Sequence, residues 1–145
     1  MIHLKSLEET QTFAKAFIEQ IKPGTVIALE GDLGAGKTTF VKYCAEALGI
    51  TETIDSPTFT LLKSYGPPLL HHIDAYRLEG GHTSFDVEDA INDPDAIIFV
   101  EWASFIQEAL PSEWIELYFT HVNEHERMLT IKKEGPLDVK KLPHH

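Results

Sequence analysis

The stretch Gly31 to Phe40, GDLGAGKTTF, places three glycines, a lysine and two threonines within ten residues. It contains the phosphate-binding pattern G-x-x-x-x-G-K-S/T, known as Walker A. Glycine lets the backbone come close to an anion, so successive N–H groups can point at a phosphate. In this pattern Lys37 reaches the β- and γ-phosphates, and the Thr38 hydroxyl ligates Mg²⁺. The residues predicted to bind nucleotide here are Gly34, Ala35, Gly36, Lys37, Thr38 and Thr39.

Two acidic residues come at the ends of apolar runs. Glu101 closes AIIFVE, in the manner of a Walker B strand, and Asp74 lies near the end of LLHHIDAY. The carboxyl ends of strands line the ligand crevice in open α/β sheets. We therefore expect both acids to face Lys37 and Thr38, with Glu101 near the metal. The alternative is that they are solvated acids at strand ends.

The elements that must position these residues are recognisable along the chain. Residues 6–21 predict a helix that begins with a capping box, Ser6 and Glu9, and ends at Pro23-Gly24. Residues 25–30 are short, apolar and rich in β-branched side chains, which indicates a buried strand. A second helix is expected over 37–48, directly after the glycine loop.

The rest of the chain predicts further strands and short helices. Strands are expected at residues 56–65, 69–76, 96–101, 113–119 and 128–133. A short helix is expected within 80–95 and another helix over 102–110. Gly66-Pro67-Pro68 is expected to turn a hairpin, and so is the loop 121–125. Strand, loop and helix followed by more strands predict an α/β, three-layer, P-loop NTPase-like fold with a mixed, partly parallel sheet flanked by helices.

Composition limits the range of functions. A chain of 145 residues is expected to form a single domain, residues 1–145. It carries 12 Lys and Arg against 23 Asp and Glu, a net charge of −11, so strong direct binding to nucleic acid is not expected. The single cysteine, Cys44, fits a reducing compartment. Without an apolar run of bilayer length or a signal pattern, we expect a cytoplasmic protein with no membrane contact.

Four motifs in order give the chain a specific resemblance. GDLGAGKTTF, SPTFTL, HIDAYRL and VEW together resemble the TsaE family, formerly YjeE, the bacterial ATPases of tRNA threonylcarbamoyladenosine biosynthesis. The resemblance runs from about residue 7 to residue 127. Within it, the segment 79–95 departs from the family pattern, which affects expected partner contacts more than nucleotide binding.

The resemblance implies a small ATPase that uses Mg²⁺ and ATP and is slow and partner-dependent. Its implied partners are a threonylcarbamoyl transferase subunit and that subunit's inactive paralogue, with tRNA bound only indirectly through them. It implies that Thr38 binds Mg²⁺ with Glu101 and Asp74 close by. Glu9 and Arg127 fall where the family has residues near the nucleotide. The segment Ser56, Pro57, Thr58 and Phe59 is similar to the family's γ-phosphate switch.

Three other functions remain possible from the residues. A kinase commonly uses several arginines, and this chain has only Arg77 and Arg127. A GTPase would carry an Asn-Lys-x-Asp signature, which does not occur, so ATP is expected to bind better than GTP. A nucleotide-sensing adaptor that hydrolyses ATP only incidentally is the third. His121 to His125 also matches the zinc-protease pattern H-x-x-E-H, but a hairpin loop would not place both histidines on one helical face.

Overall fold

The computed structural model describes residues 1–32, 34–55, 57, 61–78 and 83–144. The strands in this part of the chain are β1 (Ile2–Leu4), β2 (Val26–Gly31), β3 (Leu62–Tyr65), β4 (Leu70–Asp74), β5 (Ile97–Glu101), β6 (Ile115–His121) and β7 (Arg127–Lys133). The α-helices are α1 (Leu7–Glu19), α2 (Lys37–Ala47) and α3 (Phe85–Ile91). Three short 3₁₀ helices are η1 (Tyr76–Leu78), η2 (Ala103–Ala109) and η3 (Val139–Lys141).

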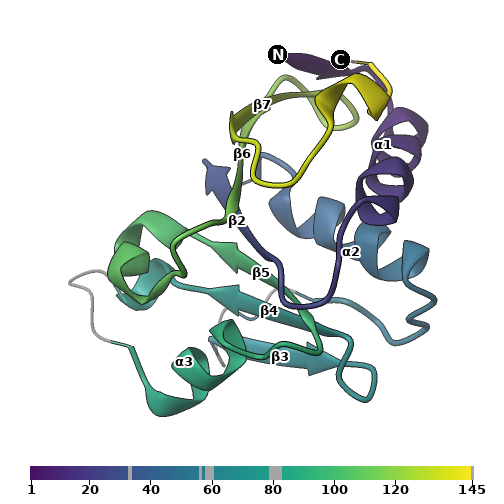
Figure 1. Ribbon diagram of the computed structural model, residues 1–145. Helices are drawn as coiled ribbons and strands as arrows, with labels where there is room; N and C mark the ends of the chain where they lie inside the picture. The colour runs from purple at the N-terminus through teal and green to yellow at the C-terminus, as the bar shows by residue number, and fades with distance from the viewer. Residues whose placement is uncertain (33, 56, 58–60, 79–82, 145) are drawn as a thin grey trace.

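Within the described residues, seven strands form one sheet in the order β1-β7-β6-β2-β5-β4-β3 (Figure 1). The four central strands, β6, β2, β5 and β4, run parallel to one another. At the edges, β7 pairs antiparallel with β6, β1 with β7, and β3 with β4. The predicted mixed, partly parallel sheet is therefore confirmed, as are the hairpins β3–β4 and β6–β7.

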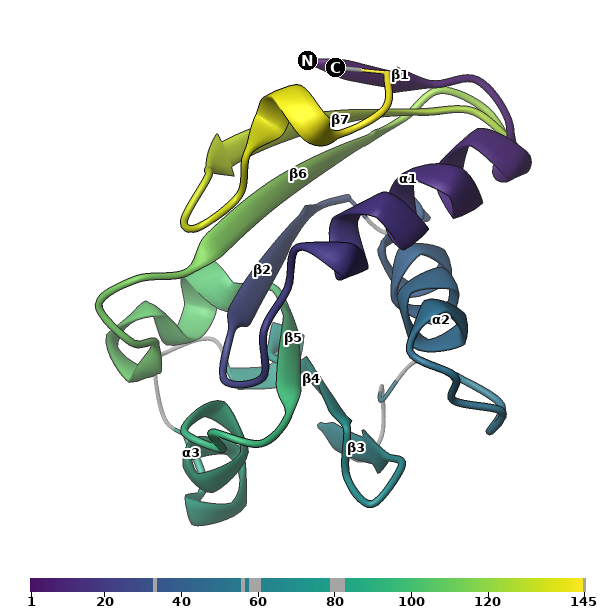
Figure 2. The same cartoon turned by 45° about the vertical axis from the view of Figure 1, so that its right-hand side comes forward.

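Helices cover both faces of the sheet. Helices α1 and α2 lie side by side on one face, and α3 and η2 pack on the other (Figure 2). Strand β2 contributes to both layers because neighbouring side chains of a strand point to opposite faces. Ile27 and Leu29 join the α1–α2 core, whereas Val26 and Ala28 join the α3–η2 core. This arrangement confirms the three-layer α/β fold and explains why β2 and β5 are almost entirely apolar.

Phe40 of α2 is the centre of the larger core. Its ring centroid lies 5.5 Å from that of Phe17 in α1, 6.4 Å from Phe99 in β5 and 5.3 Å from Phe119 in β6. Rings at these separations and tilts are in the favourable range for aromatic pairs. Because Phe40 follows the glycine loop by one helical turn, this cluster holds the start of α2 against the sheet.

The observed elements differ from the predicted ones in a few places. Strand β1 was not expected, since three residues are too short to show a periodicity, and it forms by pairing with β7. The helix expected over 102–110 is 3₁₀ rather than α, and Ile106 (φ −131°) interrupts its helical backbone. Of the strand expected over 56–65, Leu62–Tyr65 is confirmed, while Ser56 and residues 58–60 lie outside the described residues. In the described part of the chain no helix is long and apolar enough to cross a bilayer.

Candidate functional site

The glycine loop joins the end of β2 to the start of α2. Gly36 precedes the helix with φ +101°, a conformation that glycine adopts without steric cost. A Cβ atom at Gly36 would lie 2.5 Å from Nε of Arg127, which is closer than atoms can pack. The backbone conformation therefore favours glycine here, and any side chain would also have to displace the Arg127 guanidinium.

Lys37, the first residue of α2, is almost fully buried, with 4% of its surface exposed. Its ammonium group donates a hydrogen bond of 2.5 Å to the Gly31 carbonyl and lies 4.3 Å from the centroid of the Trp102 ring. Burial lowers the pKa of Lys37, and the nearby carboxylates of Glu101, Glu30 and Asp74 oppose that shift. Lys37 is thus a desolvated cation that an anionic ligand would stabilise, because an opposite charge nearby favours the charged form.

The parallel pairing of β4 with β5 brings the two predicted acids together. Asp74 and Glu101 are directly opposite in the register, each at the carboxyl end of its strand. The Thr38 hydroxyl donates a 3.2 Å hydrogen bond to Oε2 of Glu101. Burial raises the pKa of Asp74, with a further contribution from Glu101, although the Tyr76 backbone N–H donates to its carboxylate and opposes the shift.

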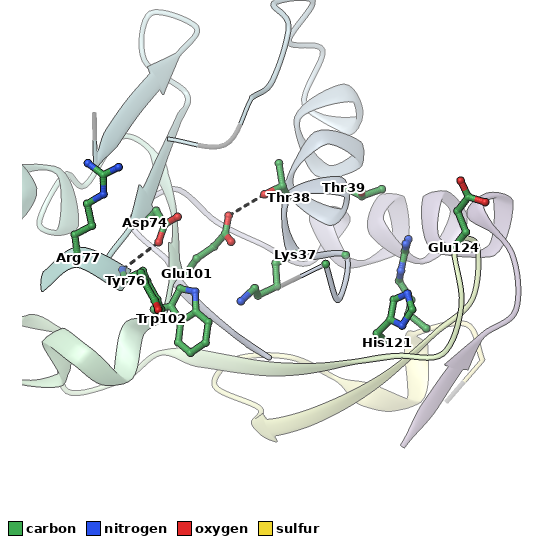
Figure 3. Close-up of a pocket in the computed structure, with 13 residues that line it drawn as sticks. Lys37, Thr38, Thr39, Asp74, Tyr76, Arg77, Glu101, Trp102, His121 and Glu124 are labelled. Carbon is green, nitrogen blue, oxygen red and sulfur yellow. Dashed lines mark hydrogen bonds between the residues drawn. The ribbon is translucent and has the colours of Figure 1, made fainter. Parts of the chain in front are cut away.

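These groups line one cavity of about 890 Å³, which is within the size range of small-ligand sites. Lys37 and Thr38 lie in the middle, with Asp74, Glu101 and Trp102 on one side (Figure 3). The other residues that line the cavity are Gly34, Gly36, Thr39, Tyr76, Arg77, His121, Glu124 and Arg127.

Arg127 begins β7 directly opposite His121 of β6, and its side chain is 5% exposed. No described residue hydrogen-bonds its Nε and Nη1 atoms, although both are buried. Burial also lowers the pKa of this guanidinium. Buried N–H donors without partners are costly, so the position of Arg127 beside Gly36 in the cavity wall points to an anionic ligand.

The remaining predicted site residues lie elsewhere. Ala35 is buried and does not line the cavity. Glu9 also lies outside the lining: its N–H donates to the Ser6 hydroxyl, and its carboxylate accepts from the Lys5 N–H. These contacts support the capping interpretation, and a nucleotide contact of Glu9 stays a prediction. In the predicted switch segment, Pro57 is buried, while Ser56, Thr58 and Phe59 lie outside the described residues.

Sequence reasoning missed several cavity residues. His121 and Glu124 reach the cavity from the β6–β7 hairpin, on the side opposite Trp102 (Figure 3). Their only sequence signal was the H-x-x-E-H pattern, which suggests different chemistry. Trp102 also lines the cavity, directly after Glu101. Its ring pairs with Tyr76, at 5.2 Å between centroids, and with Phe105, at 5.5 Å, to form an aromatic wall beside Lys37.

The chain is similar to known proteins over most of its length. The family model described as threonylcarbamoyl adenosine biosynthesis protein TsaE matches residues 4–129. The tRNA threonylcarbamoyladenosine biosynthesis protein TsaE of Bacillus subtilis is 42% identical over 130 residues, covering 88% of this chain and 82% of that protein. The protein of the same name from Rickettsia typhi is 37% identical over 137 residues, covering 91% and 94%.

The crystal structure of Bacillus subtilis YdiB superimposes on this chain with a TM-score of 0.72 and 37% identity, covering 89% of this chain and 81% of that one. The family match spans most of the chain, and the fold agrees with it. This chain therefore belongs to the TsaE family of threonylcarbamoyl adenosine biosynthesis proteins.

Proposed function

We propose that this chain is a cytoplasmic ATPase that binds and slowly hydrolyses Mg-ATP and thereby supports threonylcarbamoyladenosine modification of tRNA. The transfer itself would belong to a partner complex of a transferase subunit and its inactive paralogue. The observation that carries the ATPase proposal is the convergence, on one cavity, of Lys37 and Thr38 with Asp74 and Glu101.

The residues around Thr38 fit a magnesium ion. A hydroxyl has one proton to donate and two lone pairs. The Thr38 hydroxyl donates its proton to Glu101. Its lone pairs therefore remain to bind a cation next to that carboxylate. Mg²⁺ is commonly held by one or two protein groups together with substrate phosphates. When bound, it would neutralise charge on the β- and γ-phosphates.

The other residues have roles that follow from their contacts. Lys37 would exchange the Gly31 carbonyl for phosphate oxygens, which are stronger acceptors for an ammonium group. Asp74, whose pKa is raised by burial, is a better proton acceptor than an ordinary aspartate and is suited to orient the attacking water. Arg127 would supply a second cation to the phosphate chain from the opposite wall.

Arg127 offers a test that separates a ligand-binding arginine from a structural one. In Arg127→Met the buried cation is lost, so we expect the melting temperature without nucleotide to stay equal or rise. ATP affinity should fall by about 10-fold or more, the value of one charge-assisted hydrogen bond. Thermal unfolding and calorimetric titration measure the two quantities. A structural arginine would give the reverse, a lower melting temperature with unchanged affinity.

Lys132→Met is the matched control for this variant. It removes a cation from the same strand, but Lys132 is exposed and is not among the residues that line the cavity. Both its melting temperature and its ATP affinity should stay close to wild type.

The proposal as a whole is tested by reconstitution. Modification of tRNA by the partner complex should require this chain and ATP, and ATP turnover should rise when the partners are added. Modification that proceeds equally without this chain would contradict the proposed function. Modification that needs ATP binding but no hydrolysis, measured with a non-hydrolysable analogue, would indicate an adaptor instead.

Charge predicts where the tRNA binds. Phosphate contacts need clustered cations, and this chain has a net charge of −11. We therefore expect the partner complex to hold the tRNA, and this chain to dock on protein. Tight tRNA binding by this chain alone at physiological salt would contradict that arrangement. The segment 56–59 is our candidate for the part that makes docking depend on the γ-phosphate.

A further inference from the structure

His72 is a completely buried histidine next to the proposed magnesium site. It lies in the middle of β4, two residues before Asp74, so both side chains are on the face of the sheet that α2 covers. Its Nε2 atom is 2.5 Å from Oε2 of Glu101 on the neighbouring strand. Neither the phosphate-loop pattern nor the pairing of acids assigns a role to this residue.

The contact determines which ring nitrogen of His72 carries a proton. A carboxylate accepts hydrogen bonds, so we assign the Nε2 N–H as the donor to Glu101. The other ring nitrogen, Nδ1, is buried and has no partner among the described residues. All of the polar interaction of His72 is therefore directed at Glu101.

The neighbouring histidine gives a contrast within the same strand. His71 points to the opposite face and uses both ring nitrogens, Nδ1 with the Ser64 hydroxyl at 2.7 Å and Nε2 with Asp93 at 2.8 Å. Those contacts tie β4 to β3 and to the turn after α3, away from the cavity. His71 is thus a structural histidine, and its partners are not in the site.

Glu101 receives two hydrogen bonds on one oxygen. Thr38 of α2 and His72 of β4 both donate to Oε2, and no described residue donates to Oε1. A glutamate side chain has several rotatable bonds, and two donors from different elements restrict it to one orientation. Oε2 is held between α2 and β4, while Oε1 stays available at the cavity wall that Glu101 lines.

We propose that His72 is a positioning residue that holds the Glu101 carboxylate in the orientation needed for Mg-nucleotide binding. The inference rests on the proposed function, because it assigns Glu101 to the magnesium site. Residues that hydrogen-bond a metal ligand from behind commonly contribute 10- to 100-fold to metal affinity or activity. His72 acts through Glu101 and has no contact with the nucleotide in this scheme.

The first experiment tests the hydrogen bond itself and needs no nucleotide. Selective ¹⁵N labelling of histidine and long-range ¹H–¹⁵N NMR distinguish the two tautomers, and His72→Gln assigns the His72 signals by their loss. We expect Nε2 of His72 to carry the proton of the hydrogen bond to Glu101. A His72 ring that carries its proton only on Nδ1 would overturn the inference, whether or not the proposed function is correct.

The second experiment measures what magnesium adds to nucleotide binding. A non-hydrolysable ATP analogue is titrated into each variant with and without Mg²⁺. In His72→Phe, which keeps a ring but has no donor, we expect the magnesium-dependent gain in affinity to shrink about 10-fold or more. His72→Gln, which retains an N–H donor, should recover most of the gain. Binding without magnesium should be similar in all of them.

His71→Phe is the matched control, since it removes the adjacent histidine from the same strand. It should lower the melting temperature and leave the magnesium-dependent gain unchanged. If His72→Phe weakens binding equally with and without magnesium, His72 is only structural and the inference is wrong. If His72→Phe does not fold, the test rests on His72→Gln. A folded His72→Gln protein that loses the magnesium-dependent gain in affinity would contradict the inference. If the wild type binds no Mg-nucleotide, the proposed function fails, and this role of His72 with it.

Discussion

Lys37→Ala should hydrolyse ATP about 100-fold or more slowly than the wild type, the scale of losing one preorganised group that stabilises charge in a transition state. Lys37 is the cation at the centre of the cavity, and Glu101, Glu30 and Asp74 surround it. Its removal leaves those carboxylates without their nearest cation, so phosphate would meet net negative charge. Steady-state phosphate release, alone and with the partner complex, measures the effect.

Lys42→Ala is the control for this variant because Lys42 is on the same helix but exposed, and it does not line the cavity. Its turnover should equal that of the wild type. The Lys37→Ala protein should remain folded, since Lys37 is desolvated and its alkyl stem is a small part of the core. Near wild-type turnover in folded Lys37→Ala would contradict the assignment of the active site.

Phe40→Ala should lose about 3–5 kcal/mol of unfolding free energy, the usual cost of deleting a fully buried phenylalanine. That is a large part of the roughly 5–15 kcal/mol that stabilises a typical domain. The ring contacts Phe13 and Phe17 of α1 as well as Phe99 and Phe119 of the sheet. Its loss therefore opens a cavity between α1, α2 and the sheet. Denaturant unfolding at equilibrium gives the free energy directly.

Phe85→Ala makes the same chemical change at the start of α3, where the side chain is 80% exposed. Its unfolding free energy should stay within about 0.5 kcal/mol of the wild type. Because Phe40 follows Lys37 by one turn, Phe40→Ala should also weaken ATP binding through a less rigid α2. A loss below about 1 kcal/mol in Phe40→Ala would mean that the cluster is not the mechanical support of the phosphate loop.

The local features of the fold could be predicted from the sequence because each depends on neighbours along the chain. The glycine loop between β2 and α2 follows from residue types at fixed spacing, and α1 follows from a capping box and an apolar stripe. Strands β2 and β5 are recognisable as apolar runs, since a strand with both faces covered has no polar side. Strand β1 could not be predicted because three residues are too short to show a periodicity, and the strand forms by pairing with β7.

The candidate site also combines residues that could be predicted from the sequence with residues that could not. The sequence by itself determined a glycine loop of the Walker A pattern, two strand-end acids and the family, because a loop pattern is local and the motifs occur in a set order. Only the tertiary structure decided which distant residues join them. The register of β4 on β5 places Asp74 beside Glu101 and turns His72 towards it. The pairing of β6 with β2 brings Arg127 and His121 to the cavity from far along the chain. Strands β2 and β6 are far apart in the sequence, so their pairing depends on contacts between distant segments that bury both faces of the sheet, and not on a local pattern.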